Sequence, residues 1–233
     1  MSADNGYGGC VGNAGFALSQ SCTSGEGHYS IYSGDGKSAV EYYQGANCSN
    51  SGCASYLNRM VTDVTGSGVG VGWDSASQLS QLGGLIRQSD LNQGVIPHAL
   101  AMAVSGVVLN TTYTWPALSA DNGSSANTGF LPEGALVAIP PDVAMPAGLS
   151  ATGQMIWKAL QTYGAYARDR TEYPGPGAAN IAVVFGEANA GPALNSWAAT
   201  GEWARIGAQL RWVTNNGPDQ IGGPGNRLAP LAP

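Results

Sequence analysis

Few side chains in this sequence have the chemistry for catalysis, and four titratable residues stand out by their surroundings. The sequence contains no GxSxG elbow, phosphate-binding loop, HExxH pair or calcium-binding EF-hand loop. Glu41, His98, Asp169 and Glu187 lie instead in or beside apolar and aromatic stretches. A charged group in such a place needs a partner or a function, because burying it alone is costly. These four residues are therefore the candidate catalytic residues.

Glu41 belongs to the run HYSIYSGDGKSAVEYYQG, in which two β-prone segments flank Ser33-Gly34-Asp35-Gly36. An Asp-Gly pair between such segments predicts a β-hairpin. Alternation then places Glu41 on the same face as Tyr43. A carboxylate beside an aromatic ring on a concave sheet suits a sugar chain. The structural alternative is a solvent-facing glutamate on an edge strand.

His98 lies in the most apolar segment of the chain, VIPHALAMAVSGVVL, which we expect to form a buried strand. Alternation puts His98 on the face of Ile96 and Leu100, unless a bulge at Pro97 reverses the facing. A histidine there is either a core residue with a satisfied partner or a base that serves a reaction.

The other two candidates are carboxylates near the ends of predicted strands. Asp169 stands between Arg168 and Arg170, so it forms either a surface ion pair or the second carboxylate of a site. Glu187 ends the run IAVVFGE, where it stands either at the mouth of a cleft or on the surface.

Four further residues are candidates for substrate binding: Trp73, Tyr43, Arg87 and Tyr163. Trp73, in the Gly-rich stretch VGVGWDS, is the best candidate for a platform on which a sugar stacks, or else a lid over a small apolar cluster. Arg87 suits a substrate carboxylate, or local turn bonds with Asp90. Tyr163, with Tyr166, offers a phenol for acid–base chemistry.

The elements that position these residues indicate an all-β protein, mainly an antiparallel β-sandwich or jelly roll with long Gly-rich loops. One clear α-helix is predicted near 151–163, capped by Ser150 or Thr152 and ended by Gly164. We expect a single domain over 1–233. It has a disulfide-pinned segment at 1–27 and a Pro/Gly-rich tail at 217–233.

The overall composition excludes several classes of protein. The 233 residues carry 9 Lys and Arg against 15 Asp and Glu, a net charge of −6, and only 10% of residues are charged. This acidic balance argues against a nucleic-acid binder, and a coiled coil needs more charge and less glycine. No apolar stretch is long enough to predict a membrane span.

Cysteine usage predicts an extracellular location. Cys10, Cys22, Cys48 and Cys53 lie in Gly-rich surroundings, and this favours disulfides in an oxidising compartment. Three pairings are open, of which the sequential one is preferred; four free thiols are the alternative. No signal peptide is visible, so we expect that one was removed. No metal cofactor is implied. Asp4, Asp35 and Asp121 lie in Gly/Asn-rich loops and are the candidates to hold a structural Ca²⁺.

Two patterns resemble a known family. Gly94-x-Ile96-x-His98-Ala99-Leu100 and Tyr163-Gly164-Ala165-Tyr166-x-x-Asp169 are similar to an uncharacterised domain of secreted bacterial and fungal proteins. The resemblance covers roughly residues 31–187. It implies secretion and a single β-rich unit, and it transfers no activity.

Together these features predict a secreted carbohydrate-active protein that acts on a polysaccharide or oligosaccharide. The first hypothesis is a glycoside hydrolase, which needs two carboxyl groups beside the scissile bond; Glu41 with Asp169 or Glu187 are the expected pair. The second is a non-catalytic glycan-binding or cell-surface module. The third is a polysaccharide lyase that uses His98 or a tyrosine, with Arg87 neutralising a uronate. Distances among the three acids should separate the first hypothesis from the second.

Overall fold

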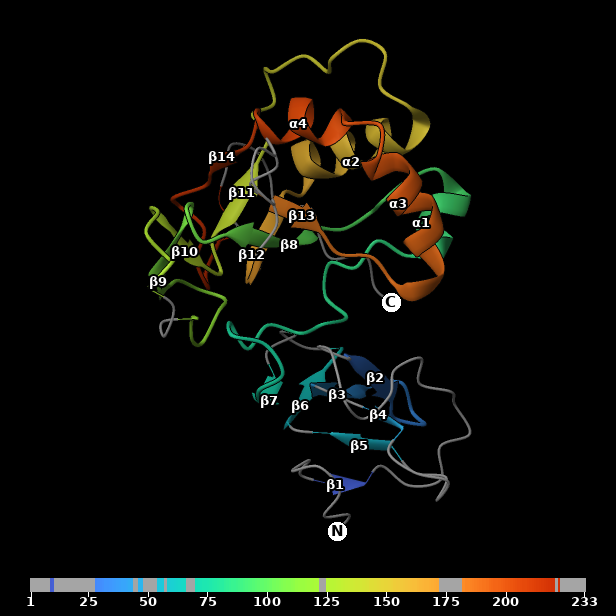
Figure 1. Cartoon of the computed structure of the whole chain (residues 1–233), viewed down its shortest axis with the longest axis vertical. Coiled ribbons are helices and arrows are strands. Elements are labelled where there is room, and N and C mark those ends of the chain that lie inside the picture. Colours follow the sequence, from blue (N-terminus) through green and yellow to red (C-terminus); the bar gives the residue numbers. More distant parts are fainter. Residues whose placement is uncertain are drawn as a thin grey trace. The chain divides into compact units, whose positions relative to one another are not determined.

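The structure is a computed structural model, and it describes residues 9–10, 28–43, 46–47, 54–56, 58–65, 70–121, 125–171, 182–220 and 222. Its contacts divide the chain into two compact units, the first Met1–Leu82 and the second Gly83–Ala232 (Figure 1). The single domain expected from the sequence stays a prediction. So do the disulfides, because Cys22, Cys48, Cys53 and the side chain of Cys10 lie outside the described residues.

The first unit contains a four-stranded antiparallel sheet in the order β2-β3-β6-β7. Its strands are β2 (Tyr29–Tyr32), β3 (Ser38–Tyr43), β6 (Asn58–Asp63) and β7 (Gly70–Gly72). Three shorter strands, β1 (Gly9–Cys10), β5 (Ala54–Tyr56) and β4 (Ala46–Asn47), form a second sheet in that order.

The predicted hairpin at 33–36 is confirmed as the connection between β2 and β3. The Asp35 carboxylate accepts hydrogen bonds from the Ser33 hydroxyl, at 2.6 Å, and from the Lys37 amide, at 3.1 Å. These bonds lower the pKa of Asp35. Gly36 takes a left-handed conformation with φ +70°, which a side chain would disfavour. The turn chemistry therefore fixes the register of β3, and with it the position of Glu41.

The second unit is built on a five-stranded mixed sheet in the order β13-β8-β12-β11-β14. Its strands are β13 (Ala182–Val184), β8 (Leu100–Ser105), β12 (Ala165–Thr171), β11 (Leu136–Ala138) and β14 (Arg211–Trp212). The pair β8–β12 is parallel and the other pairs are antiparallel. Two more strands, β9 (Leu109–Tyr113) and β10 (Leu131–Glu133), pair in parallel beside this sheet.

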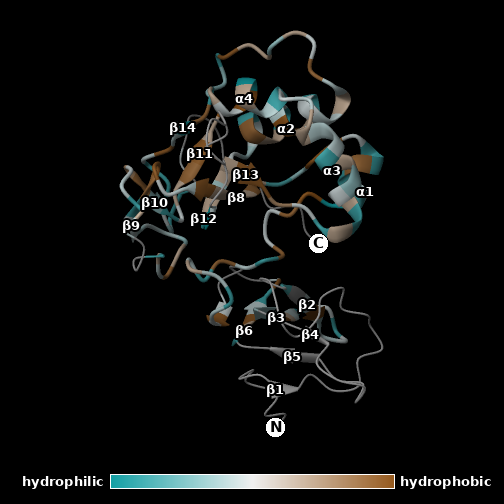
Figure 2. Cartoon of the chain, in the orientation of Figure 1, coloured by the Kyte–Doolittle hydropathy of each residue, from teal (hydrophilic) through white to brown (hydrophobic). Residues whose placement is uncertain are grey.

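The strand predicted in VIPHALAMAVSGVVL is confirmed as β8, and it is buried along nearly its whole length. A strand covered on both faces has to be apolar throughout rather than alternating. Figure 2 shows apolar residues concentrated in this part of the second unit. The run of Ala, Met and Val in β8 therefore places it at the centre of the core.

The predicted helix is confirmed as α2 (Ala151–Thr162). The Ser150 hydroxyl accepts a hydrogen bond from the Gly153 amide at 3.1 Å and caps the helix. The apolar stripe faces the core, where Trp157 and Leu160 are fully buried. Gly164 ends the helix with φ +77°, and a Cβ there would lie 2.7 Å from the Val137 carbonyl oxygen. Glycine is thus required where the chain turns from α2 into β12.

Three short helices accompany α2: α1 (Gln88–Gln93), α3 (Gly191–Ala198) and α4 (Glu202–Gly207). A 3₁₀ turn, η2 (Ala188–Ala190), precedes α3. Helices α3 and α4 pack against α2, and α2 contacts β11 (Figure 1). None of the helices in the described ranges is long and apolar enough to cross a membrane.

The β-rich character predicted from the sequence is confirmed. The sandwich or jelly roll stays a prediction. The parallel pair β8–β12 differs from the mainly antiparallel pairing that we expected. Its cause is long-range: β9, β10, β11 and α2 lie between β8 and β12 in the chain, and this long connection lets the chain return alongside β8 in the same direction.

Candidate ligand-binding site

Two hollows in the second unit meet at the edge strand β14. Register places Trp212 opposite Val137 and Arg211 opposite Ala138, so β14 is anchored to β11 on one side only. The Val213 amide extends this pairing with a 2.8 Å hydrogen bond to the Leu136 carbonyl. Both residues of β14 are exposed, and β11 is its only partner among the described strands. Arg211 and Trp212 line both hollows.

The first hollow, which we call the polar cleft, has a volume of about 530 Å³. Its lining mixes two aromatic side chains with amide, carboxylate and guanidinium groups: Tyr163, Trp212, Gln161, Asn215, Asp142 and Arg211. The end of α2 supplies Gln161 and Tyr163. The Gln161 amide nitrogen donates to the carbonyl oxygens of Pro140 and Val143, which leaves its amide oxygen as an acceptor.

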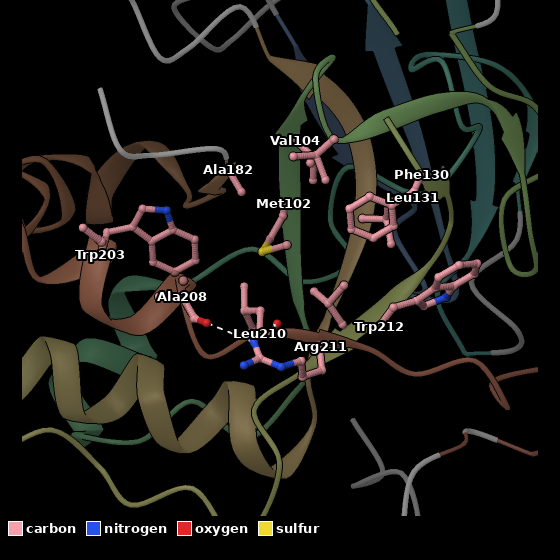
Figure 3. A pocket seen from close by; sticks show the side chains of 14 residues that line it. Met102, Val104, Phe130, Leu131, Ala182, Trp203, Ala208, Leu210, Arg211 and Trp212 are labelled. Atoms are coloured by element: carbon pink, nitrogen blue, oxygen red, sulfur yellow. Dashed lines mark hydrogen bonds between the residues drawn. The ribbon is translucent and has the colours of Figure 1, made fainter. Parts of the chain in front are cut away.

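The second hollow, which we call the apolar cavity, has a volume of about 170 Å³. It lies between the sheet and α4 (Figure 3). Its lining is mostly large and apolar, and includes Met102, Leu131, Val137, Trp203, Leu210 and Phe130. Arg211 is the charged residue among the described residues that line it.

A buried carboxyl group lies elsewhere in the second unit, at Glu133 of β10. Glu133 is fully buried, and its Oε1 accepts a hydrogen bond from the Asp121 amide at 3.3 Å. Its Oε2 has no hydrogen-bond partner among the described residues. Burial, reinforced by the negative charges of Asp169 and Asp121, raises the pKa of Glu133 to about 8. This carboxyl group is therefore mostly protonated at pH 7, and its acidic neighbours are near enough to help raise its pKa.

The neighbours of Glu133 come from different elements. Asp169 lies in β12, directly after a register shift at Arg168 in the pairing with β8. Asp121 lies 3.9 Å from the guanidinium of Arg170. Glu133 was not among the candidates selected from the sequence, although it stands as a lone glutamate in the apolar run LPEGALVAIP, the same kind of position as that of Glu41.

Glu41 is in the first unit, where it is fully buried on β3. Its carboxylate accepts a 2.7 Å hydrogen bond from the Ser80 hydroxyl and another from the Gln81 amide. The Gln81 side chain in turn donates to Asp74, which is also fully buried. These bonds tie the 74–82 loop to the sheet, and the solvent-facing alternative for Glu41 does not hold.

Tyr43 and Trp73, two residues predicted to bind a sugar, lie close together in the first unit, and their binding role stays a prediction. The ring centroids of Tyr43 and Trp73 lie 6.1 Å apart. The ring centroid of His28 lies 5.1 Å from that of Tyr43. Trp73 is 48% exposed, as a stacking surface requires.

His98, Arg87 and Glu187 gather around the start of α1. His98 precedes β8 rather than lying in it, and its Nε2 is 3.1 Å from Asp90 Oδ2 while its Nδ1 is 2.9 Å from the Ala99 carbonyl oxygen. The Asp90 carboxylate also accepts a hydrogen bond from the Arg87 backbone amide at 2.8 Å. The Glu187 carboxylate accepts one from the Gln88 backbone amide at 2.7 Å.

The candidate acids thus occupy separate surroundings. Glu41 and Glu187 each accept backbone amides, whereas Asp169 lies near Glu133. Tyr163 alone of the predicted residues lines the polar cleft. The catalytic roles stay predictions. For a structural Ca²⁺ the candidates were Asp4, Asp35 and Asp121; Asp4 lies outside the described residues, and no metal-holding group of three or more His, Cys, Asp or Glu occurs among those described.

No family model, curated protein or solved structure matches this chain. The resemblance to a secreted domain therefore stays a prediction.

Proposed function

We propose that the protein is a secreted saccharide-binding protein and that the polar cleft is its binding site. The observation that carries this proposal is the composition of the cleft: the indole of Trp212, which is 40% exposed, and Tyr163 stand among polar groups in a hollow of about 530 Å³. That volume lies in the range of roughly 300–1,000 Å³ usual for ligand pockets.

The lining suits the mixed surface of a sugar. A pyranose ring presents C–H groups on its faces, which pack on aromatic side chains, and hydroxyl groups on its edge. Asn215, Asp142 and the Gln161 oxygen offer acceptors or donors for such hydroxyls. The scarcity of charge and the clustered cysteines support an extracellular location.

Binding is favoured over hydrolysis at this cleft by its shortage of carboxyl groups. Hydrolysis of a glycosidic bond ordinarily needs a pair of them. Asp142 is the one acidic side chain among the described residues that line the cleft. The cleft therefore has the means to hold a saccharide without the groups that cleave one.

The test is a panel of oligosaccharides titrated against the protein by calorimetry, followed by the variant Trp212→Ala on whichever saccharide binds. Loss of the stacking surface should weaken binding by about ten-fold or more. Tyr113→Ala is the matched control, because Tyr113 is 55% exposed in the same unit and does not line the cleft. Absence of binding across the panel, or equal losses in both variants, would count against the proposal.

A second candidate function is glycoside hydrolysis at Glu133. The favouring observation is the buried carboxyl of Glu133, whose raised pKa suits a general acid, near Asp169, which supplies a second carboxyl group. Release of reducing ends from the same panel, abolished by Glu133→Gln, is the expected result of this function. Products with ultraviolet absorbance would indicate a lyase instead. Saccharides that bind and stay intact would indicate a binding protein without hydrolase activity.

A further inference from the structure

We propose that the apolar cavity binds a small aromatic carboxylate, with the ring inside the cavity and the carboxylate on Arg211. This inference goes beyond saccharide binding. It concerns the other hollow beside β14 and a ligand of different chemistry.

The walls of the cavity are built from the core of the second unit. Met102, Leu131 and Val137 belong to the strands, and each is at least nine-tenths buried. Trp203 and Leu210 come from α4 and the turn after it. Figure 3 shows Trp203 and Trp212 at opposite sides of the cavity, with Met102 and Leu210 between them. The hollow is therefore held open by packed elements rather than by a loop.

The size and lining of the cavity suit one aromatic ring. Its volume is about 170 Å³. An apolar cavity of about 150 Å³ in another protein stays dry and binds benzene. Aromatic rings pack favourably on the edges and faces of other rings, and methionine sulfur adds a favourable contact with them. Trp203, Phe130 and Met102 supply such contacts.

The positive charge of Arg211 is the partner for the carboxylate end of the ligand. Its Nη1 donates to the Ala208 carbonyl oxygen at 3.0 Å and to the Leu210 carbonyl oxygen at 2.7 Å, which orients the guanidinium (Figure 3). In the part of the chain that the structure describes, Arg211 forms no ion pair with an acidic side chain. A guanidinium has five N–H donors, so donors remain for a carboxylate in a forked arrangement.

Exposed apolar surface at the rim adds to the argument. Phe130 is 65% exposed and Trp212 is 40% exposed, although both line the cavity. Apolar surface of this kind gains free energy when a ligand covers it. A ring that enters between them removes this surface from water and brings its carboxylate to Arg211.

The experiment compares two probes of the same shape by calorimetry, 3-phenylpropanoate and 3-phenylpropan-1-ol, at low ionic strength. We expect the carboxylate to bind about ten-fold more tightly than the alcohol, because a charge-assisted pair is stronger than a neutral hydrogen bond. Propanoate, which lacks the ring, should bind too weakly to measure. Equal affinity for the acid and the alcohol, or no binding of either, would overturn the proposal.

Substitutions assign the binding to the cavity. Arg211→Gln should abolish the preference for the acid while the alcohol still binds. The control Arg205→Gln should leave the preference for the acid unchanged. Arg205 is exposed on α4, donates a hydrogen bond to the Ala147 carbonyl oxygen and does not line the cavity. A preference that survives Arg211→Gln, or that both variants lose, contradicts the assignment.

Filling the cavity tests the position of the ring. Ala204→Leu and Ala208→Leu add bulk at two lining positions on or next to α4, and each should weaken both ring-bearing probes about ten-fold by removing space for the ring. Ala193→Leu, on the exposed side of α3, is the control. Ala208 is exposed, so its variant remains informative if Ala204→Leu does not fold. Tyr163→Ala, in the polar cleft, should leave the aromatic carboxylate unaffected, which separates failure here from failure of the saccharide proposal.

Discussion

At Glu133, one carboxyl oxygen meets the Asp121 amide and the other has no hydrogen-bond partner among the described residues. A buried carboxylate without full compensation is costly, so the group keeps its proton. The cost is relieved by protonation rather than by an ion pair, although Arg170 lies near Asp121. The stability of the second unit should consequently depend on pH through this side chain.

Glu133→Gln should make stability less sensitive to pH. The pKa of Glu133 rises from 4.5 to about 8 on folding. Between these values the unfolded chain releases the proton while the folded one keeps it, so stability falls as the pH rises, by at most about 1.4 kcal/mol per pH unit. Glutamine does not titrate, and the variant should lose little between pH 5 and pH 8. Urea denaturation at both pH values measures the difference, and parallel losses in both proteins would refute it.

The surroundings of Glu133 show which properties of a single acid depend on residues far away in the chain. Lone acids in apolar runs such as Glu41 could be recognised from the sequence, whereas the full burial of Glu41 was not predicted. What each acid touches could not be recognised, because Ser80 lies 39 residues from Glu41, and Asp169 lies 36 residues from Glu133. Local patterns do not encode such distant pairs.

Among the elements, three helices of the second unit are joined at Glu202. Its Oε1 accepts the Ser150 amide at 2.7 Å, and its Oε2 accepts the Ser150 hydroxyl at 2.9 Å and the Trp197 indole at 2.8 Å. Burial acts to raise the pKa of Glu202, but these hydrogen bonds outweigh it and leave the pKa below its usual value. A lowered pKa means that this contribution to stability is present at neutral pH and is lost on acidification.

Gly153→Ala should lower the free energy of unfolding by about 1–3 kcal/mol, although alanine favours helices more than glycine does. A Cβ at position 153 of α2 would collide with Glu202 Oε2. Gly191→Ala is the matched control, since that helical glycine has open space around its Cα and an ordinary helical φ of −50°. Thermal and urea unfolding measure both variants. A Gly153→Ala protein as stable as Gly191→Ala would show that the contact with Glu202 is dispensable.

Over the whole molecule, the candidate residues selected from the sequence belong to two compact units. Glu41 belongs to the first unit, and both hollows are lined by residues of the second. The Glu41 carboxylate holds the 74–82 loop to β3 through the hydrogen bonds that it accepts from Ser80 and Gln81. The structure thus gives Glu41 a structural role within its own unit.

Glu41→Gln should destabilise the first unit by about 1–3 kcal/mol, because an amide nitrogen cannot accept the hydrogen bonds that one carboxylate oxygen accepts. Saccharide binding at the polar cleft should change less than two-fold, within ordinary additivity of separate sites. Hydrogen exchange of the first unit and calorimetry of binding measure the two effects. Asp63→Asn, an exposed carboxylate on β6, is the control. Loss of binding in Glu41→Gln would restore the role that the sequence predicted for it.

The sequence by itself determined the features that depend on neighbours in the chain. The Asp-Gly turn, the Ser150 cap of α2 and the apolar run of β8 were each identified because turn geometry, capping and burial act over a few residues. Tertiary structure decided the rest: the parallel pairing of β8 with β12, the register shift at Arg168 and the two hollows beside β14. These arise from contacts between segments far apart in the chain, whose free energy no local pattern of residues records.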